Sequence, residues 1–305
     1  MWRFAFNHGL WDPCNVQLSH VFRCISTTDQ ENALKFAYKR DVKSFLVCWL
    51  LQFSLAARLL TLYMARRLFG LDPINVNVKR SAYRRPYLEG ELDFDFNLSH
   101  NGDFTLLTSC HEMRTGVDVM QVELPSCCRG GTISPKMVHS TSAASESVAG
   151  FLLKMKSLFA PSEWHLLTST SCEDGGRIRN FFRLWVCSTA CLKEAFVKNI
   201  GTGLRTDVST VEFDLSGAAP KCTYPGLVDT EWRFEEHQLP NSHVAAVAWY
   251  NPGALNKCSG VEPFQELSPN DLLDTLSPWN EVKDHFWSAY CFKDMCPPSA
   301  RRVLY

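Results

Sequence analysis

The sequence predicts an α+β fold made of two similar halves, each with a small antiparallel sheet and a long helix. Short apolar runs bounded by turn residues are typical of strands, and the clearest pair is Phe104–Cys110 and Gly116–Met120. Apolar residues at helical spacing over Ala33–Phe69 and Phe181–Gly203 predict the helices. Because both parts of the chain carry a long helix and short strands, we expect one helix to cover each sheet.

The composition limits the class of protein. A length of 305 residues is enough for two domains, and 46% hydrophobic residues can fill their cores. The formal net charge of −1 means that only a local patch can bind a polyanion, so we expect no nucleic-acid partner. The 13 cysteines are odd in number and scattered, which favours reduced thiols in the cytosol over a disulfide framework or a zinc site.

Neither a secretory leader nor a membrane span is expected. The first residues lack the long apolar core of a signal peptide. The apolar stretch Phe45–Ala57 has 13 residues, whereas a helix needs roughly 20 to cross a bilayer. We therefore interpret this stretch as a buried helix, and expect a cytoplasmic monomer that binds no membrane.

The first third of the chain begins with a strand and continues with helices. Trp2–Trp11 alternates enough for a first strand. The polar cluster Ser26–Gln30 can cap a helix that starts near Glu31. The helical pattern of Ala33–Phe69 is expected to end at Gly70, because glycine is the usual residue just past a helix end.

A compact basic loop follows the first long helix. Lys79, Arg80, Arg84 and Arg85 are four cations in seven residues, directly before Pro86. Such a loop suits a phosphate-rich ligand, since guanidinium groups bind phosphate oxygens in pairs. The alternative is a solvated run of surface charge.

Two sites with candidate chemistry lie around the predicted pair of strands. Asp93–Leu98 is expected to be a strand that leads into Ser99, His100 and Asn101 at its turn. Asp118 lies between two valines in a later strand. Because an unpaired buried carboxylate is costly, Asp118 must have a partner, either a divalent cation or a lysine or arginine.

The rest of the chain adds one irregular segment and further short elements. Residues 121–147 are rich in Ser, Thr, Gly and Cys and are interpreted as a mobile insertion. The later elements that we expect are a helix at Val148–Phe159, helix-capping residues at Pro161–Glu163, strands at Val211–Leu215, Trp232–Glu236 and His243–Trp249, a helical turn at Asn270–Leu276, and an aromatic docking segment at Asp284–Phe292.

Glu194 and Lys198 are four residues apart, which places them on one face of a helix. A pair with this spacing is commonly an exposed salt bridge of small energy. Its neighbours Phe196, Val197 and Ile200 make the helix mostly apolar, which indicates a packed position rather than a purely solvated one.

Three ordered motifs resemble a known family. They are N-L-S-H-N-G-D at 97–103, G-V-D-V at 116–119, and L-K-E-A-F-V-K-N-I-G-T-G-L at 192–204 after Trp185. Together they resemble the large, pseudo-dimeric 4′-phosphopantetheinyl transferases, most of all the animal members, from about Trp2 to Phe292. The resemblance implies two subdomains related by pseudo-twofold symmetry, at residues 1–115 and 116–250, followed by a loop-rich tail at 251–305.

The resemblance also implies an activity. It is transfer of the 4′-phosphopantetheine group from coenzyme A to a serine of acyl carrier protein domains, with release of adenosine 3′,5′-bisphosphate, as in the holo-[acyl-carrier-protein] synthase type. Magnesium (Mg²⁺) is the implied cofactor. The implied partners are acyl carrier proteins and the carrier domains of fatty acid synthase-like and aminoadipate-reductase-like proteins, the latter a link to lysine metabolism.

Residue roles carry over by the same resemblance. Asp118 and Glu194, expected from separate halves, are the implied metal ligands, and Lys198 completes the catalytic set by holding a phosphate. Met120 stands where bacterial relatives often have a third acid, so a water or Asn101 is expected to complete the metal shell. The implied coenzyme A contacts are Arg80, Ser81, Arg84, Arg85, Pro86, Asn97, Ser99, His100 and Lys198, with His100 at the 3′-phosphate.

Two insertions relative to the family pattern lead to an alternative. Val47–Leu55 adds nine residues to the first long helix, and Val186–Ala190 adds five residues before Glu194. Each rotates a continuous helix by roughly half a turn. The second insertion either bulges out, or precedes the start of the helix, or disturbs the active site. In the last case the chain is a non-catalytic homologue that binds coenzyme A or a carrier protein.

A third hypothesis is a general nucleotide-binding protein, which predicts equal affinity for ATP and coenzyme A.

Overall fold

A computed structural model describes residues 1–35, 55–82, 85–90, 93–122, 156–169, 188–252, 261–282 and 284–294. These residues form two compact units. Unit 1 consists of Met1–His111 together with Glu262–Tyr305, and unit 2 consists of Glu112–Val261. Each unit has its own buried apolar cluster, and each is described by itself.

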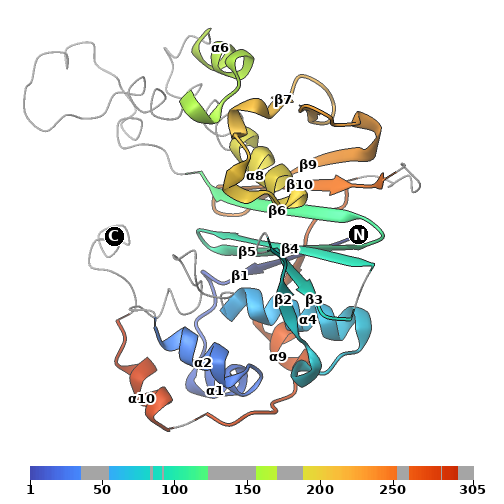
Figure 1. Cartoon of the computed structure of the whole chain (residues 1–305). Helices are drawn as coiled ribbons and strands as arrows, with labels where there is room; N and C mark the ends of the chain where they lie inside the picture. The colour runs from blue at the N-terminus through green and yellow to red at the C-terminus, as the bar shows by residue number, and fades with distance from the viewer. Residues whose placement is uncertain are drawn as a thin grey trace, which may run out of the picture. The chain divides into compact units, whose positions relative to one another are not determined.

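Unit 1 is built on a four-stranded sheet in the order β11-β1-β5-β4 (Figure 1). β1 and β5 are antiparallel, β5 and β4 are antiparallel, and β11 is parallel to β1. A separate hairpin of β2 and β3 contains the basic residues Lys79, Arg80 and Arg85. The strands are β1 (Trp2–Asn7), β2 (Val78–Arg80), β3 (Pro86–Leu88), β4 (Phe94–Asn101), β5 (Phe104–His111) and β11 (Gln265–Leu267).

Helix α4 (Leu55–Phe69) packs on this sheet through residues such as Leu59 and Leu60, which are fully buried with Phe4 and Phe6. It ends as predicted at Gly70, which has a φ of +66° and donates its backbone N–H to Arg66 O. The other elements of unit 1 are α1 (Asn15–Arg23), α2 (Thr27–Leu34), the 3₁₀ turn η1 (Pro73–Asn75), α9 (Pro269–Thr275) and α10 (Asp284–Cys291).

The expected cap of α2 is present, but the helix begins four residues earlier than predicted. Ser26 Oγ accepts the backbone N–H of Asp29, so Ser26 caps a helix that starts at Thr27 and not near Glu31. The polar residues that we took for a cap form the first turn of the helix. Helix α1 was not predicted, although its buried residues Leu18, Val21 and Phe22 stand at helical spacing.

The C-terminal segment, expected to be a loop-rich tail, contributes β11, α9 and α10 to unit 1. The backbone N–H groups of Trp279 and Asn280 donate to Arg23 O at the end of α1, at 3.0 and 2.9 Å. The docking of the last helix by an aromatic side chain is confirmed, since buried Tyr290 meets Phe22 edge-on at 6.2 Å between ring centroids. The segment is therefore part of the folded unit.

Unit 2 is built on a three-stranded antiparallel sheet in the order β6-β10-β9, with α8 lying across β6 and β10 (Figure 1). Its elements are β6 (Arg114–Gln121), η4 (Lys156–Leu158), α6 (Pro161–Ser169), α8 (Ser188–Ile200), η6 (Gly203–Arg205), η7 (Val208–Thr210), β7 (Glu212–Asp214), β8 (Lys221–Thr223), η8 (Asp229–Glu231), β9 (Trp232–Leu239) and β10 (His243–Tyr250).

The predicted α+β class is confirmed, because each unit contains a small sheet with a helix packed on it, antiparallel in unit 2 and antiparallel except for the parallel edge strand β11 in unit 1. The pseudo-twofold relation between the halves and the subdomain boundaries stay predictions.

Some expectations concern segments outside the described residues. These segments are the insertion at residues 123–147, most of Val148–Phe159, and all but Leu55 of the segment 47–55. Among the described helices none has both the length and the apolar character that a membrane crossing requires.

Candidate active site

Asp118 lies in the middle of β6, opposite Ala246 of the central strand β10. Side chains alternate along a strand, so Asp118 shares a face with Gly116 and Met120, the face on which α8 packs. Its side chain is 12% exposed. The sequence pattern of an acid between valines is thereby explained, since the valines face the other side of the sheet.

The partner of Asp118 is Lys198. The Lys198 ammonium donates to Asp118 Oδ1 at 2.7 Å and to the backbone carbonyl of Val117 at 3.1 Å. Of the two partners that the sequence left open, a cation on the protein or a divalent metal ion, the structure shows the first. The ion pair also fixes the position of Lys198, which the resemblance had assigned to a substrate phosphate.

Glu194 lies one helical turn before Lys198 and adds a second carboxylate to the cluster. Glu194 is exposed as a residue, but partial desolvation of its carboxyl by neighbouring groups raises its pKa, the negative charge of Asp118 raises it further, and Lys198 lowers it in part. The two acids are therefore near enough to repel each other. We expected them to come from separate halves, but both belong to unit 2.

A close approach of backbones sets the distance between α8 and β6. A Cβ added at Gly116 would lie 2.0 Å from the carbonyl oxygen of Ala195 and 2.6 Å from the backbone nitrogen of Asn199. Only glycine leaves room for the helix here. The glycine of the G-V-D-V motif thus allows the turn that carries Glu194 and Lys198 to lie over Asp118.

Replacing Gly116 by alanine is expected to lower the free energy of unfolding by about 1–3 kcal/mol, because the added methyl group pushes α8 away from β6. The activity that the resemblance implies is expected to fall by more than the loss of stability explains, since the acids and the lysine are moved apart. Thermal unfolding and rate measurements check this. Gly217→Ala is the control, because its nearest neighbour would be 3.6 Å from the new Cβ. Equal effects of the two substitutions would contradict the explanation.

Asn199 holds the other side of the helix to the sheet, and the sequence did not single it out. Its fully buried side chain donates from Nδ2 to Arg114 O on β6 at 3.0 Å and to Ala248 O on β10 at 2.8 Å. A lone amide among apolar helix residues was the available signal. Asn199 is a positioning residue, since it orients the face of α8 that carries Lys198.

A buried ion pair supports the start of α8. Lys193, 1% exposed, donates to Glu163 Oε2 and to Val208 O at 2.5 and 3.2 Å. The same carboxylate accepts the backbone N–H groups of Ala160 and Phe213, each at 2.8 Å. The predicted capping role of Glu163 is confirmed, but its link to the lysine of the L-K-E motif required the tertiary structure.

Cys191 is the thiol nearest this cluster. It is fully buried, and its Sγ donates to Val244 O at 3.7 Å. Burial raises the pKa of the thiol well above its usual value, and the negative charge of Asp118 adds to the shift. Cys191 is therefore a packing residue in its protonated form and no nucleophile.

The basic loop of unit 1 is only partly described, since Arg84 lies outside the described residues. Arg85 forms a bidentate ion pair with Asp95, with Nε–Oδ1 at 3.1 Å, and its backbone N–H donates to Ser81 Oγ. Pro86 begins β3. The interaction with Asp95 orients Arg85 within the hairpin, and its role toward a phosphate stays a prediction.

The predicted polar trio lies on a strand and not in a turn. Ser99, His100 and Asn101 are the last three residues of β4 and pair with β5, because the reversal of the chain follows at Gly102–Asp103. Ser99 and the predicted contact Asn97 are buried. The strand continues further than predicted, since polar residues can pair through their backbones as well as apolar ones do.

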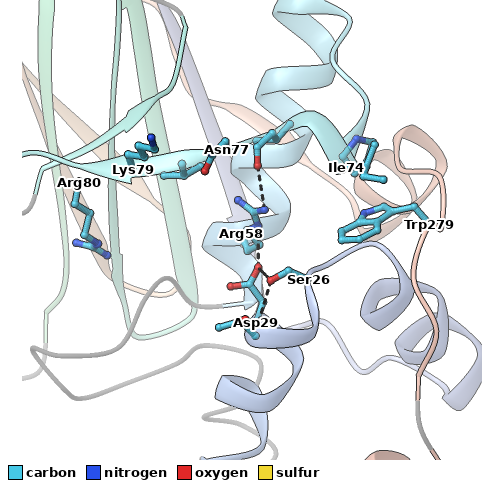
Figure 2. Close-up of a pocket in the computed structure, with 12 residues that line it drawn as sticks. Ser26, Asp29, Arg58, Ile74, Asn77, Lys79, Arg80 and Trp279 are labelled. Atoms are coloured by element: carbon cyan, nitrogen blue, oxygen red, sulfur yellow. Dashed lines mark hydrogen bonds and ion pairs between the residues drawn. The ribbon is translucent and has the colours of Figure 1, made fainter.

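Arg80, another predicted coenzyme A contact, lines a cavity of about 520 Å³ in unit 1 (Figure 2). The cavity lies between the start of α2, the first turn of α4, the segment 73–80 and the C-terminal segment. Arg58 and Asp29 form an ion pair in it, with Nε–Oδ2 at 3.3 Å. Burial lowers the pKa of the Arg58 guanidinium, and Asp29 opposes this shift.

Comparisons with known proteins agree with this arrangement. A family model described as 4′-phosphopantetheinyl transferase, N-terminal, matches residues 9–112, and the model of the 4′-phosphopantetheinyl transferase superfamily matches residues 144–248. The human L-aminoadipate-semialdehyde dehydrogenase-phosphopantetheinyl transferase is 27% identical over 97% of this chain and 92% of its own length. A phosphopantetheinyl transferase of Thraustochytrium is 27% identical over 78% of this chain and 74% of its own.

Among solved structures, the crystal structure of Thermotoga maritima holo-[acyl-carrier-protein] synthase is 19% identical. The likeness covers 45% of this chain and 62% of that one, with a TM-score of 0.28. The sequence comparisons are sufficient, because the two family models together match well over half of the chain. The chain therefore belongs to the 4′-phosphopantetheinyl transferase superfamily.

Proposed function

We propose that this phosphopantetheinyl transferase moves the 4′-phosphopantetheine group from coenzyme A to a serine of a carrier protein domain and releases adenosine 3′,5′-bisphosphate. The observation that carries the proposal is the cluster of Asp118, Glu194 and Lys198 on one face of unit 2. Two acids that repel each other beside one lysine are suited to a divalent cation and an anionic substrate. The names of the relatives support the same reaction class.

The donor set fits Mg²⁺. Magnesium prefers oxygen ligands and usually takes only one or two carboxylates, with water and substrate phosphate in the remaining positions. Asp118 and Glu194 are the carboxylates that would hold it. Within the part of the chain that the structure describes there is no cluster of three His, Cys, Asp or Glu residues, and Met120 packs in the apolar cluster of unit 2. When bound, the ion neutralises charge on the pyrophosphate.

The chemistry requires only positioning and charge from the protein itself. The carrier serine oxygen forms a bond to the phosphorus that bears the pantetheine, and the bond from that phosphorus to the bridging oxygen breaks. The serine proton leaves to a base in solution or on the substrate. Lys198 supplies a fixed positive charge for the phosphate oxygens, which is the kind of stabilisation that lowers barriers to phosphoryl transfer.

The substrate contacts proposed for unit 1 are the basic and polar residues that the resemblance names. They receive support from the cavity at Arg80, a concave site with cations at one end. The remaining members of this set are Ser81, Arg84, Arg85, Pro86, Asn97, Ser99 and His100.

The condition of α8 supports a catalytic protein over the non-catalytic alternative. From Ser188 the helix runs without interruption through Glu194 and Lys198 to Ile200, although three of its first residues belong to the insertion 186–190. Trp185 and the first two inserted residues lie outside the described range. Glu194 and Lys198 keep a common face of α8 beside Asp118, and this supports the catalytic alternative.

Mass spectrometry tests the proposal. We expect an apo acyl carrier protein incubated with coenzyme A, Mg²⁺ and this protein to gain the mass of one phosphopantetheine group. Binding of coenzyme A without any mass gain on several carrier proteins would favour the non-catalytic homologue.

We further propose a monomer in the cytosol, a location supported by six described cysteines that are free thiols. The carrier proteins proposed as partners are those of fatty acid synthase-like and aminoadipate-reductase-like proteins.

Replacing Glu194 by glutamine is expected to raise the melting temperature at pH 7 in the absence of divalent ions. The raised pKa of Glu194 means that its ionised form destabilises the folded protein above that pKa, and that wild type recovers stability as the pH falls toward 4.5. The difference between variant and wild type should therefore shrink with falling pH. Mg²⁺ is expected to stabilise the wild type and to have little effect on the variant. A variant less stable than wild type at pH 7 would contradict the assigned repulsion.

A further inference from the structure

The cavity at Arg80 has two chemically different ends (Figure 2). Arg80 and Lys79, the latter paired with Glu89, are both on β2 and lie at one end, while Trp279 and Ile74 lie at the other, with the Arg58–Asp29 ion pair between them. The ion pair balances its own charge, so the centre is polar without a strong net charge. A ligand with phosphates at one end and a flat apolar group at the other matches this order.

The apolar end is unusual because its side chains face water. Trp279 is 37% exposed and Ile74 is 61% exposed, although both are large hydrophobic residues. They come from segments distant in the sequence and line the same cavity. Single exposed apolar residues are ordinary, but an indole and an isoleucine together in a cavity with cations are typical of ligand sites.

The indole is held in place by the protein. Trp279 Nε1 donates to Cys24 O at 3.2 Å, and its backbone N–H donates to Arg23 O at 3.0 Å. The adjacent Asn280 donates from Nδ2 to Ile25 O at 3.1 Å. An aromatic surface fixed before binding loses little conformational entropy when a ligand packs on it.

We propose that Trp279 is the stacking surface for the purine base of coenzyme A, with Ile74 beside it, so that the C-terminal segment selects the nucleoside end of the substrate. The inference rests on the proposed function, because coenzyme A is the ligand that function supplies. Trp279 lies outside both ranges that match the family models, so no motif of the family points to it. Its position follows from the hydrogen bonds that bring the C-terminal segment to α1 and α2.

Calorimetry with adenosine 3′,5′-bisphosphate tests the proposal on the full chain. Trp279→Ala is expected to weaken binding by about tenfold, since stacking of one base on an aromatic side chain is worth about 1–3 kcal/mol. Trp279→Phe, which keeps a ring, is expected to stay within about threefold of wild type. In transfer assays Trp279→Ala should raise the KM for coenzyme A and leave kcat unchanged, because the base is remote from the reacting phosphorus.

Asn280→Ala is the matched control. The substitution removes the side-chain hydrogen bonds from Asn280 to Ile25 O and to Thr27 Oγ1 of α2, and it leaves the indole of Trp279 in place. It is therefore expected to lower stability but to change nucleotide affinity less than threefold. Unchanged affinity in Trp279→Ala, or an equal loss in Asn280→Ala, would overturn the stacking role while transfer by the wild type stayed intact. Absence of both transfer and nucleotide binding in the wild type would instead overturn the proposed function together with this inference.

Discussion

Replacing Lys193 by methionine is expected to lower the free energy of unfolding by about 3–5 kcal/mol, the usual result of leaving one member of a buried ion pair alone. The side chains of Lys193 and Glu163 are 2% and 3% exposed, so water cannot replace the lost ammonium. Glu163 would keep two backbone N–H donors but no positive charge. Denaturant unfolding of the wild type and the variant measures the difference.

The double variant Glu163→Gln, Lys193→Met separates the charge from the packing. Because it leaves no uncompensated buried charge, we expect it to recover much of the lost stability. Lys79→Met is the control for removing a lysine, since Lys79 pairs with Glu89 on the surface. A Lys193→Met variant no less stable than Lys79→Met would show that the buried pair does not stabilise the start of α8.

Replacing Asp118 by asparagine is expected to lower kcat/KM for phosphopantetheine transfer by at least about 100-fold. The substitution removes one of two carboxylates proposed for Mg²⁺ and leaves Lys198 without its anion. Metal ions contribute several kcal/mol to transition-state charge stabilisation, and each 1.36 kcal/mol is a factor of about ten in rate. Rates come from the mass gain of an apo carrier protein with time.

A control variant and a stability measurement show whether the loss of activity comes from the missing carboxylate of Asp118. Asp274→Asn, at an exposed position of α9, controls for the exchange of an aspartate and is expected to keep wild-type activity. Thermal unfolding shows whether Asp118→Asn remains folded. A folded Asp118→Asn variant with activity within threefold of wild type would remove Asp118 from the site.

Strand prediction succeeded where apolar runs were continuous. Phe104–Cys110 and Gly116–Met120 became β5 and β6 with small extensions, and His243–Trp249 became β10. The three-residue strands β2, β3, β8 and β11 were not predicted, because so few residues give no periodic signal. β2 with β3 and β8 with β7 form local hairpins, whereas β11 pairs with the distant strand β1.

The sequence predicted which residues belong to the candidate site, but not which of them contact one another. The spacing of Glu194 and Lys198 placed both on one helix face, and the setting of Asp118 required a partner. Which group that partner is depends on how α8 crosses β6, and this crossing depends on Gly116 and Asn199. The lone amide of Asn199 and the glycine of the G-V-D-V motif were visible in the sequence, but their contacts across α8 and β6 exist only in the tertiary structure.

The sequence by itself determined the superfamily, the α+β class and the three charged residues of the candidate active site, because motifs and periodicity are properties of neighbouring residues. Only the tertiary structure decided that Lys198 binds Asp118, that Lys193 binds Glu163, and that the C-terminal segment places Trp279 in a cavity with Arg80. Each of these contacts joins residues 30 to about 200 positions apart. Such pairs are selected by the packing of helices on sheets and by the cost of leaving buried charges unpaired.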